Sequence, residues 1–378
     1  MKILGFIEKK SLIPWLDSLS KEYETFLPVQ DNENARIDFM EYNDFIKMSS
    51  SKDSKVPQKY RINFSEKTRL SPKMVFFPGT EKFFDFEYIK DTTDPENIHT
   101  DLIISETKET ERPKLLFGLK PCDIAGLKRL DIFYGEGQNK DTYYLSKRKA
   151  SIVISIGCNN PFPDCFCTSV DGHPFDFENA DIGMVEMDKG YAIVKSSENA
   201  KKILASSKKF ISNKFKAEDE AIAVDGILKD SEEKIKEYWK EIGKDKLTKI
   251  MDRSMESDVW KEITAKCISC AACTYVCPTC FCFNIRDEQK SLKGERYRCW
   301  DYCMNSYYTL EASGHNPRAD KNKRYRNKVN CKYNYNIKRS NNIFCVGCGR
   351  CIEVCPVSVD IREVVDTVIE HDKNVSNT

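Results

Sequence analysis

Short apolar runs that end at Gly or Pro recur through the first half of the chain. Four of them are KMVFFPGT, KLLFGLKPC, SIVISIGC and YAIVK, which start at residues 73, 114, 151 and 191. Short runs of β-branched and aromatic residues closed by turn residues are typical of buried strands. Residues 123–133 instead carry apolar side chains at helical spacing, and we expect Asp123 to cap the start of that helix. We therefore predict a mixed α/β domain over residues 1–195.

The polar and apolar pattern changes after residue 195. Residues 196–262 are rich in Lys, Glu, Ile and Leu and contain no Pro. The apolar side chains of Ile235, Tyr238, Trp239 and Ile242 recur at helical spacing. We predict a helical connector here, followed by a second domain over residues 263–378.

Composition and charge exclude several classes of protein. The chain has 378 residues, with 60 Lys or Arg against 59 Asp or Glu, so it is not a globally basic nucleic-acid binder. It has no apolar run of the ~18 residues that a membrane span needs, and the opening MKILGFIEKK is too short in apolar residues for a signal peptide. We expect a soluble cytoplasmic protein without a membrane partner.

Cysteine is the strongest compositional signal. The chain has 17 cysteines but only four histidines, and the histidines are scattered. Cytosolic thiols stay reduced, so this number indicates metal binding and not disulfides.

Two cysteine motifs with identical spacing lie in the second domain. The spacing CxxCxxCxxxCP occurs at Cys267 and again at Cys345. In such pairs three closely spaced thiolates hold one [4Fe-4S] cubane, and the fourth cysteine reaches the other cluster. The first predicted ligand set is Cys267, Cys270, Cys273 and Cys355, and the second is Cys345, Cys348, Cys351 and Cys277. The alternative is a pair of four-cysteine zinc sites, although these usually have CxxC pairs without the trailing Pro.

Four further cysteines lie at strand ends and loops of the first domain: Cys122, Cys158, Cys165 and Cys167. We expect them to converge on a third [4Fe-4S] cluster. Two alternatives stay open at this point. The thiols are packed as small apolar side chains, or Cys122 is a catalytic thiol.

Five cysteines and one basic segment have no place in these sets. We expect Cys280 and Cys282 to pack beside the first cluster, and Cys331 has no assigned role. Cys299 and Cys303 form a CxxxC pair that loosely resembles those of sirohaem enzymes, but the ferredoxin-type spacing already assigns the further cysteines that such a site would need. Residues 318–339 contain nine Lys or Arg and a single Asp. We interpret this segment as a solvated basic surface, with docking of an acidic partner or binding of single-stranded nucleic acid as alternatives.

These motifs together resemble the iron-sulfur A subunit of anaerobic sulfite reductase and the similar beta subunit of soluble nickel-iron sulfhydrogenases. The resemblance runs from about residue 71 to about residue 362. Its residues are Pro121-Cys122-Asp123, Cys165-Phe166-Cys167-Thr168-Ser169, CISCAACTYVCPTCFC, Trp300 with Cys303, Gly314-His315 and CVGCGRCIEVCP. It implies a helical ferredoxin-type second domain, so the expected fold class is α+β.

The resemblance also implies a function within a heteromeric complex. This subunit would relay electrons between a flavin subunit that oxidises NAD(P)H, or ferredoxin, and a catalytic subunit of sulfite reductase or hydrogenase type. No residue of this chain is expected to be catalytic, and nucleic acid is not an expected partner. Two alternative functions stay open: a stand-alone reductase with a site-differentiated cluster or sirohaem, and an RNA-binding iron-sulfur protein.

Overall fold

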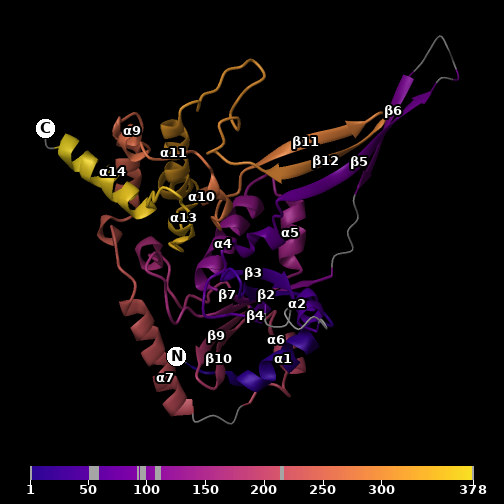
Figure 1. The fold of residues 1–378 in the computed structure, drawn as a ribbon, viewed down its shortest axis with the longest axis vertical. Coiled ribbons are helices and arrows are strands. Elements are labelled where there is room, and N and C mark those ends of the chain that lie inside the picture. The colour runs from indigo at the N-terminus through magenta and orange to yellow at the C-terminus, as the bar shows by residue number, and fades with distance from the viewer. Residues whose placement is uncertain are drawn as a thin grey trace.

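The computed structural model describes residues 2–50, 59–91, 93, 99–106, 112–212 and 217–376. This part of the chain forms two sheets and a group of helices (Figure 1). The described residues contain both helices and sheets, with strands and helices mixed in the N-terminal half and mainly helices near the C-terminus, so the predicted α+β class is confirmed.

An eight-stranded sheet forms the centre of the N-terminal half. Its order is β1-β10-β9-β8-β7-β2-β3, and β4 pairs with the end of β2. The pairs β2–β7, β7–β8 and β8–β9 are parallel, and the other pairs are antiparallel. The strands are β1 (Gly5–Glu8), β2 (Glu24–Asp31), β3 (Arg36–Glu41), β4 (Tyr60–Ile62), β7 (Lys114–Leu119), β8 (Ile152–Ile156), β9 (Ile182–Met187) and β10 (Gly190–Ser196).

Both faces of this sheet are buried under helices. Along β7, Leu115 and Phe117 enter one apolar core, while Leu116 and Leu119 enter the other. Strands buried on both faces read as continuous apolar runs, which is why the sequence of β7 shows no alternation. The first core receives α1 (Lys9–Leu19), α2 (Tyr42–Ser49) and α6 (Lys201–Ser206), and the second receives α4 (Pro121–Gly135), α5 (Thr142–Lys149) and α7 (Ala217–Glu233).

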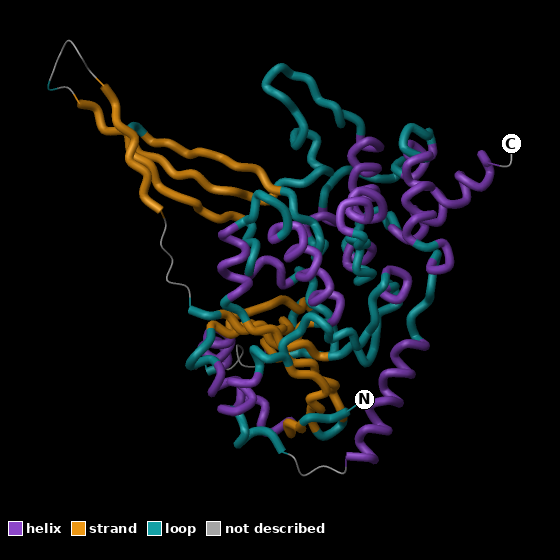
Figure 2. The backbone as a smooth tube through the Cα atoms, turned by 180° about the vertical axis from the view of Figure 1, so that it is seen from behind, coloured by secondary structure: helices purple, strands orange, loops and turns teal. Residues whose placement is uncertain are grey.

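A second sheet extends away from the rest of the molecule as an arm (Figures 1 and 2). It has the order β11-β12-β5-β6, and all its pairs are antiparallel. Its strands are β5 (Thr80–Asp91), β6 (His99–Glu106), β11 (Phe283–Lys290) and β12 (Lys293–Trp300). The β11–β12 hairpin lies inside residues 263–378, for which the sequence predicted helices. The sequence did not reveal the hairpin, because its partner strand β5 is distant in the chain.

The remaining helices form the C-terminal unit around an apolar core that includes Trp260, Tyr333 and Val365. Phe166 and Val170 of the N-terminal half enter the same core, so the two halves pack together. The helices are α8 (Lys244–Arg253), α9 (Val259–Ile263), α10 (Ala272–Tyr275), α11 (Lys321–Asn330), α12 (Asn336–Ser340), α13 (Arg350–Glu353) and α14 (Ile361–Ser376). Short helical turns are η1 (Pro72–Val75), η2 (Cys167–Val170), η3 (Lys240–Ile242) and the π-turn η4 (Cys331–Tyr335).

Three local predictions are wrong. Residues 235–242 do not form one helix, since α7 ends at Glu233 and only the turn η3 precedes α8. The run at residues 73–79 is not a strand, because Pro72 and the Ser71 side chain, which accepts from the Lys73 N–H, start the turn η1, and β5 begins only at Thr80. Helix α4 begins at Pro121 with Lys120 as its N-cap, so Asp123 does not cap it. Pro is preorganised for the first helical position, which moves the helix start ahead of Asp123.

Candidate metal centres

The two cysteine motifs fold alike. Ser269 and Ala271 of the first motif have φ of 58° and 63°, and the equivalent Gly347 and Gly349 of the second have φ of 62° and 72°. Each motif then enters one short helix, α10 or α13. Left-handed residues within such a segment turn successive N–H groups towards one point, as in other anion and iron-sulfur sites.

The first predicted ligand set surrounds a single cavity, lined by Cys267, Cys270, Cys273 and Cys355. The Ser269 amide donates to the Cys267 sulfur over 3.4 Å, and the Val359 amide donates to the Cys355 sulfur over 3.2 Å. Cys355 therefore lies with the first motif and away from the beginning of its own, which is the placement that crossed ligation requires. The ligation itself stays a prediction.

The second predicted set adjoins the first, because Cys351 lines the first cavity, and its cysteines are buried or half-buried. A hydrogen bond from Cys280 lowers the pKa of Cys277 well below its ordinary value, and Lys332 and Lys73 act in the same direction. Burial raises the pKa of Cys345 to about 11, against hydrogen bonds from Tyr333 and the Gly347 amide that lower it. The charges of Cys277 and Cys348 act on Cys345, and the charges of Cys345, Cys348 and Cys277 act on Cys351.

The four cysteines of the first domain also converge on one cavity. Cys122 lies in the first turn of α4, Cys158 follows β8, Cys167 begins η2 and Cys165 lies two residues before it. Cys348 of the second motif lines the same cavity. The sequence placed these thiols at strand ends, and the sheet brings them together.

The protonation of these thiols argues against an activated nucleophile. Burial, followed by the charge of Asp123, raises the pKa of Cys122 well above its ordinary value. Burial likewise raises the pKa of Cys165 to about 11 and that of Cys167 to about 12. Reactive cysteines have lowered pKa values, whereas coordination to a metal removes the proton outright.

Buried cations stand against the thiol groups. Lys328 and Lys332 are each 4% exposed, and Arg350 is 2% exposed. Burial alone lowers the pKa of Lys328, but the charges of Cys273, Tyr325 and Cys351 outweigh it and raise that pKa. A buried ammonium is costly unless an anion compensates it. These cations therefore fit thiolate-bound clusters, which carry net negative charge.

This arrangement corrects one expectation about the basic segment. Residues 318–339 were expected to form a solvated surface, yet Arg324, Lys328 and Lys332 are buried. Arg324 donates to backbone carbonyls of residues 318 and 319, while Lys332 donates to Thr279. The basic residues alternate between solvent and the thiol groups because α11 and η4 are helical.

A buried ion pair joins the second motif to the first domain. Arg350 and Asp123 are both 1% exposed at their side chains, with 2.7 Å between Arg350 Nη1 and Asp123 Oδ1. Arg350 Nε also donates to the Thr68 carbonyl over 2.7 Å. Both residues adjoin predicted ligands, since Cys122 precedes Asp123 and Cys351 follows Arg350.

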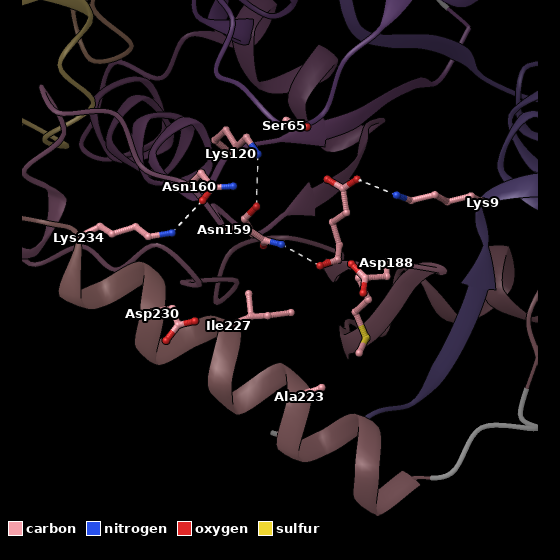
Figure 3. Close-up of a pocket in the computed structure, with 13 residues that line it drawn as sticks. Lys9, Ser65, Lys120, Asn159, Asn160, Asp188, Ala223, Ile227, Asp230 and Lys234 are labelled. Atoms are coloured by element: carbon pink, nitrogen blue, oxygen red, sulfur yellow. Dashed lines mark hydrogen bonds and ion pairs between the residues drawn. The ribbon is translucent and has the colours of Figure 1, made fainter.

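An open cleft of about 580 Å³ lies beside the third thiol group (Figure 3). The carboxyl ends of β7, β8 and β9 line it, together with α7. Lys120 borders both this cleft and the cavity of the third group. The Ser231 hydroxyl of α7 donates to the Cys158 carbonyl over 2.5 Å. Helix α7 is therefore fixed to a loop that carries a predicted ligand.

A site for a single metal ion needs several ligands close around one point. Within the described residues, no three side chains of His, Cys, Asp or Glu are arranged around one metal ion. The cysteines of a cubane each bind a different iron atom, so they are spread around a larger centre.

Comparison with known proteins identifies the family. The model of the 4Fe-4S dicluster domain family matches residues 266–359, which contain both motifs. The sulfhydrogenase 2 subunit beta of Pyrococcus furiosus is 33% identical over 266 residues, covering 68% of this chain and 74% of the relative. The chain belongs to the family of sulfhydrogenase beta subunits. No solved structure matches it.

Family membership confirms the resemblance that the motifs indicate. As a sulfhydrogenase beta-type chain, the protein is an iron-sulfur electron-transfer subunit that carries [4Fe-4S] clusters. No helix in the described part of the chain is long and apolar enough to cross a membrane.

Sequence reasoning missed the cations that face the thiols. Lys73, Lys332 and Arg350 contact the backbone or side chains around the cysteines from three separate segments. Their only sequence signal is a basic residue next to a cysteine or aromatic run, which occurs equally on protein surfaces.

Proposed function

We propose that this chain holds three [4Fe-4S] clusters in series and relays single electrons through them. The first is bound by Cys267, Cys270, Cys273 and Cys355, the second by Cys345, Cys348, Cys351 and Cys277, and the third by Cys122, Cys158, Cys165 and Cys167. When bound, such clusters supply one-electron transfer. Four protein thiolates leave no open position on a cubane, so substrate chemistry belongs to another subunit.

The adjacency of the three thiol groups carries this proposal. Cys351 and Cys348 both belong to the second ligand set, but Cys351 also lines the first cavity and Cys348 the third. The second group thus lies between the other two. Because electron transfer favours short distances between neighbouring clusters, we expect an electron to pass along the series in the order first, second, third or in the reverse order.

The residues around the thiols hold charge and exclude water. Backbone amides donate to the sulfurs of Cys267, Cys345 and Cys355. Such hydrogen bonds and burial set the reduction potential of a cluster. The buried lysines compensate the negative charge that an arriving electron increases.

We infer the partners from the resemblance of the motifs, and membership of the beta-subunit family supports a complex of several subunits. A flavin subunit that oxidises NAD(P)H, or ferredoxin, supplies electrons to one end of the series, and a catalytic subunit of sulfhydrogenase type receives them at the other. A catalytic subunit of the anaerobic sulfite reductase type is the variant of this proposal. None of the 17 cysteines is in a disulfide, and a thiol-rich chain of this kind suits the reducing cytoplasm, which we propose as its compartment.

Cys165→Ser in the anaerobically purified complex tests the relay. We expect the variant to lose about four irons per chain and most of its NADPH-driven turnover. Oxidation of NADPH by an artificial dye should stay unchanged, because that reaction needs only the flavin subunit. Parental NADPH-driven turnover in a variant that has lost its third cluster would contradict the proposal. Hydrogen or sulfide as product identifies the catalytic partner.

A further inference from the structure

Four cysteines outside the three sets gather at the base of the arm. They are Cys280, Cys282, Cys303 and Cys331. Cys282 directly precedes β11, Cys303 follows the end of β12 by three residues, and Cys331 begins η4. The fifth surplus cysteine, Cys299, lies within β12 opposite Asn284. The four thiols thus come from three segments that only the tertiary fold brings together.

These thiols are mutual neighbours. The charges of Cys282 and Cys331, after burial, help to raise the pKa of Cys303 to about 12. The segments that carry these thiols are joined by hydrogen bonds: Lys73 Nζ bonds both to the Cys280 carbonyl and to the Tyr302 hydroxyl, over 3.0 and 3.2 Å. Lys332, the residue after Cys331, donates to the Thr279 carbonyl over 3.0 Å. Cys280 and Cys303 are buried, at 7% and 8% exposed.

Each of three thiols receives a hydrogen bond from a polar side chain. Asn336 Nδ2 donates to the Cys331 sulfur over 3.4 Å. The Tyr308 hydroxyl bonds to Cys282, and the Asn327 side chain bonds to Cys303. The predicted ligands Cys273 and Cys345 are bonded in the same way, by Lys328 and Tyr333. Thiols packed as small apolar groups need no such donors.

A fully buried lysine faces the group. Lys73 is 0% exposed, and its Nζ donates to the carbonyls of Cys277 and Cys280 over 2.8 and 3.0 Å. The same Nζ lies 4.6 Å from the centre of the Trp300 ring at the end of β12. Among the described residues, no carboxylate forms an ion pair with it. Its Nζ also bonds to the Tyr302 hydroxyl over 3.2 Å. Burial lowers the pKa of Lys73 to about 8, whereas the charges of Cys280, Cys277 and Cys282 act in the opposite direction, so deprotonated thiols at this place favour the ammonium.

We propose that Cys280, Cys282, Cys303 and Cys331 bind a fourth cluster of the [4Fe-4S] class. Each thiol loses its proton when its sulfur binds iron. This site goes beyond the three-cluster relay and lies next to the second ligand set, because Cys280 is hydrogen-bonded to Cys277. It also fixes the root of the arm, since Cys282 and Trp300 are the residues at which the β11–β12 hairpin meets the body.

The test uses the double variant Cys282→Ser with Cys303→Ser, in the full chain produced anaerobically. Cys299→Ser is the matched control, because it removes a surplus thiol outside the group. We expect the double variant to lose about four irons and four sulfides relative to the parent, and the control to lose none. Iron equal to that of the parent, or loss of zinc in its place, overturns the proposal. Cys165→Ser tests the third cluster separately, so the two proposals fail independently.

A milder variant keeps the test decisive if the double variant does not fold. Tyr308→Phe retains all thiols but removes the donor to Cys282. We expect unchanged iron and a lowered reduction potential of one cluster, since a hydrogen bond to a ligand sulfur stabilises the reduced state. The control is Tyr307→Phe, whose side chain is 73% exposed. Identical redox titrations of Tyr308→Phe and the parent overturn the proposal.

Discussion

At the scale of single residues, the burial of charge is the most informative feature of the site. Lys328, Lys332 and Arg350 are almost inaccessible to solvent, although a lysine or arginine is rarely buried unless it is paired. Arg350 has a carboxylate partner in Asp123. Lys328 and Lys332 have thiols as their main anionic neighbours. The charge of a bound cluster is thus part of what stabilises the fold.

Replacing Lys328 by Met should lower the reduction potential of the cluster held by the first set. The ammonium donates to Cys273 and favours the added electron, so its loss disfavours reduction. We expect a fall of several tens of millivolts, since about 59 mV corresponds to ~1.4 kcal/mol for one electron. Redox titration followed by paramagnetic resonance measures it. Lys323→Met on the same helix, 42% exposed, should leave the titration unchanged, and an equal shift in both variants would contradict the charge argument.

Replacing Asp123 by Asn should destabilise the protein strongly. The change leaves the Arg350 guanidinium buried without its carboxylate partner, and breaking a buried pair in this way costs about 3–5 kcal/mol. Anaerobic urea unfolding measures the loss. Asp287→Asn breaks a half-exposed pair with Arg296 on the arm and should change stability little. Equal losses in the two variants would show that burial does not determine the strength of the pair.

At the scale of elements, the second motif is shaped by its contact with the first domain. A Cβ at Gly347 would lie 2.5 Å from the backbone of Cys167, and one at Gly349 would lie 2.6 Å from the Asp164 carbonyl oxygen. The Phe166 amide donates to the Gly347 carbonyl over 2.8 Å. The equivalent positions of the first motif are Ser269 and Ala271, so the glycines of the second motif serve close packing.

Replacing Gly347 by Ala should therefore displace the loop that carries Cys165 and Cys167. We expect a loss of ~1–3 kcal/mol from overpacking, in addition to backbone strain, and a loss of iron from the third site. Gly314→Ala is the matched control, because Gly314 also has positive φ, at 83°, but open space around it. The control should show the strain alone and keep its iron. Full iron content in Gly347→Ala would contradict the proposed link between this contact and the third cluster.

At the scale of the whole molecule, the two halves of the chain are interleaved. The arm takes two strands from each half, and the root of the arm is fixed by Arg298 of β12. Its guanidinium pairs with Glu81 of β5 and with Asp141 at the N-terminus of α5. The side chain is 1% exposed. Arg298 is therefore one buried cation that ties the arm to the body, and Lys147 of α5 pairs with the same Glu81.

Replacing Arg298 by Met should loosen the arm. Two carboxylates lose their shared partner, and we expect ~3–5 kcal/mol less stability from the broken buried pairs. Hydrogen exchange should rise along β5 and β12 and stay unchanged in β7 and β8. Arg296→Met, two residues away on the same strand and exposed, should not raise exchange at the root. Uniform acceleration through the molecule would instead indicate global unfolding.

The sequence alone determined the chemistry of the protein. Cysteine spacing is a local property, so both CxxCxxCxxxCP motifs and their predicted ligand sets were readable without any structure. The buried strands β7, β8 and β10 were readable for the same reason, because their apolar runs are continuous and bounded by turn residues. The motifs in their order also indicated the family, which the comparisons confirm.

Only the tertiary structure decided which distant segments meet. No periodicity marks β11 and β12 as partners of β5, because that pairing depends on contacts far apart in the sequence. The sequence predicted that Cys122, Cys158, Cys165 and Cys167 converge but left alternatives open, and only the fold places them around one cavity. The fold alone brings Cys282, Cys303 and Cys331 together and turns the lysines inward. Burial and charge compensation are properties of the folded whole, and a sequence records the residue types but not the distances between them.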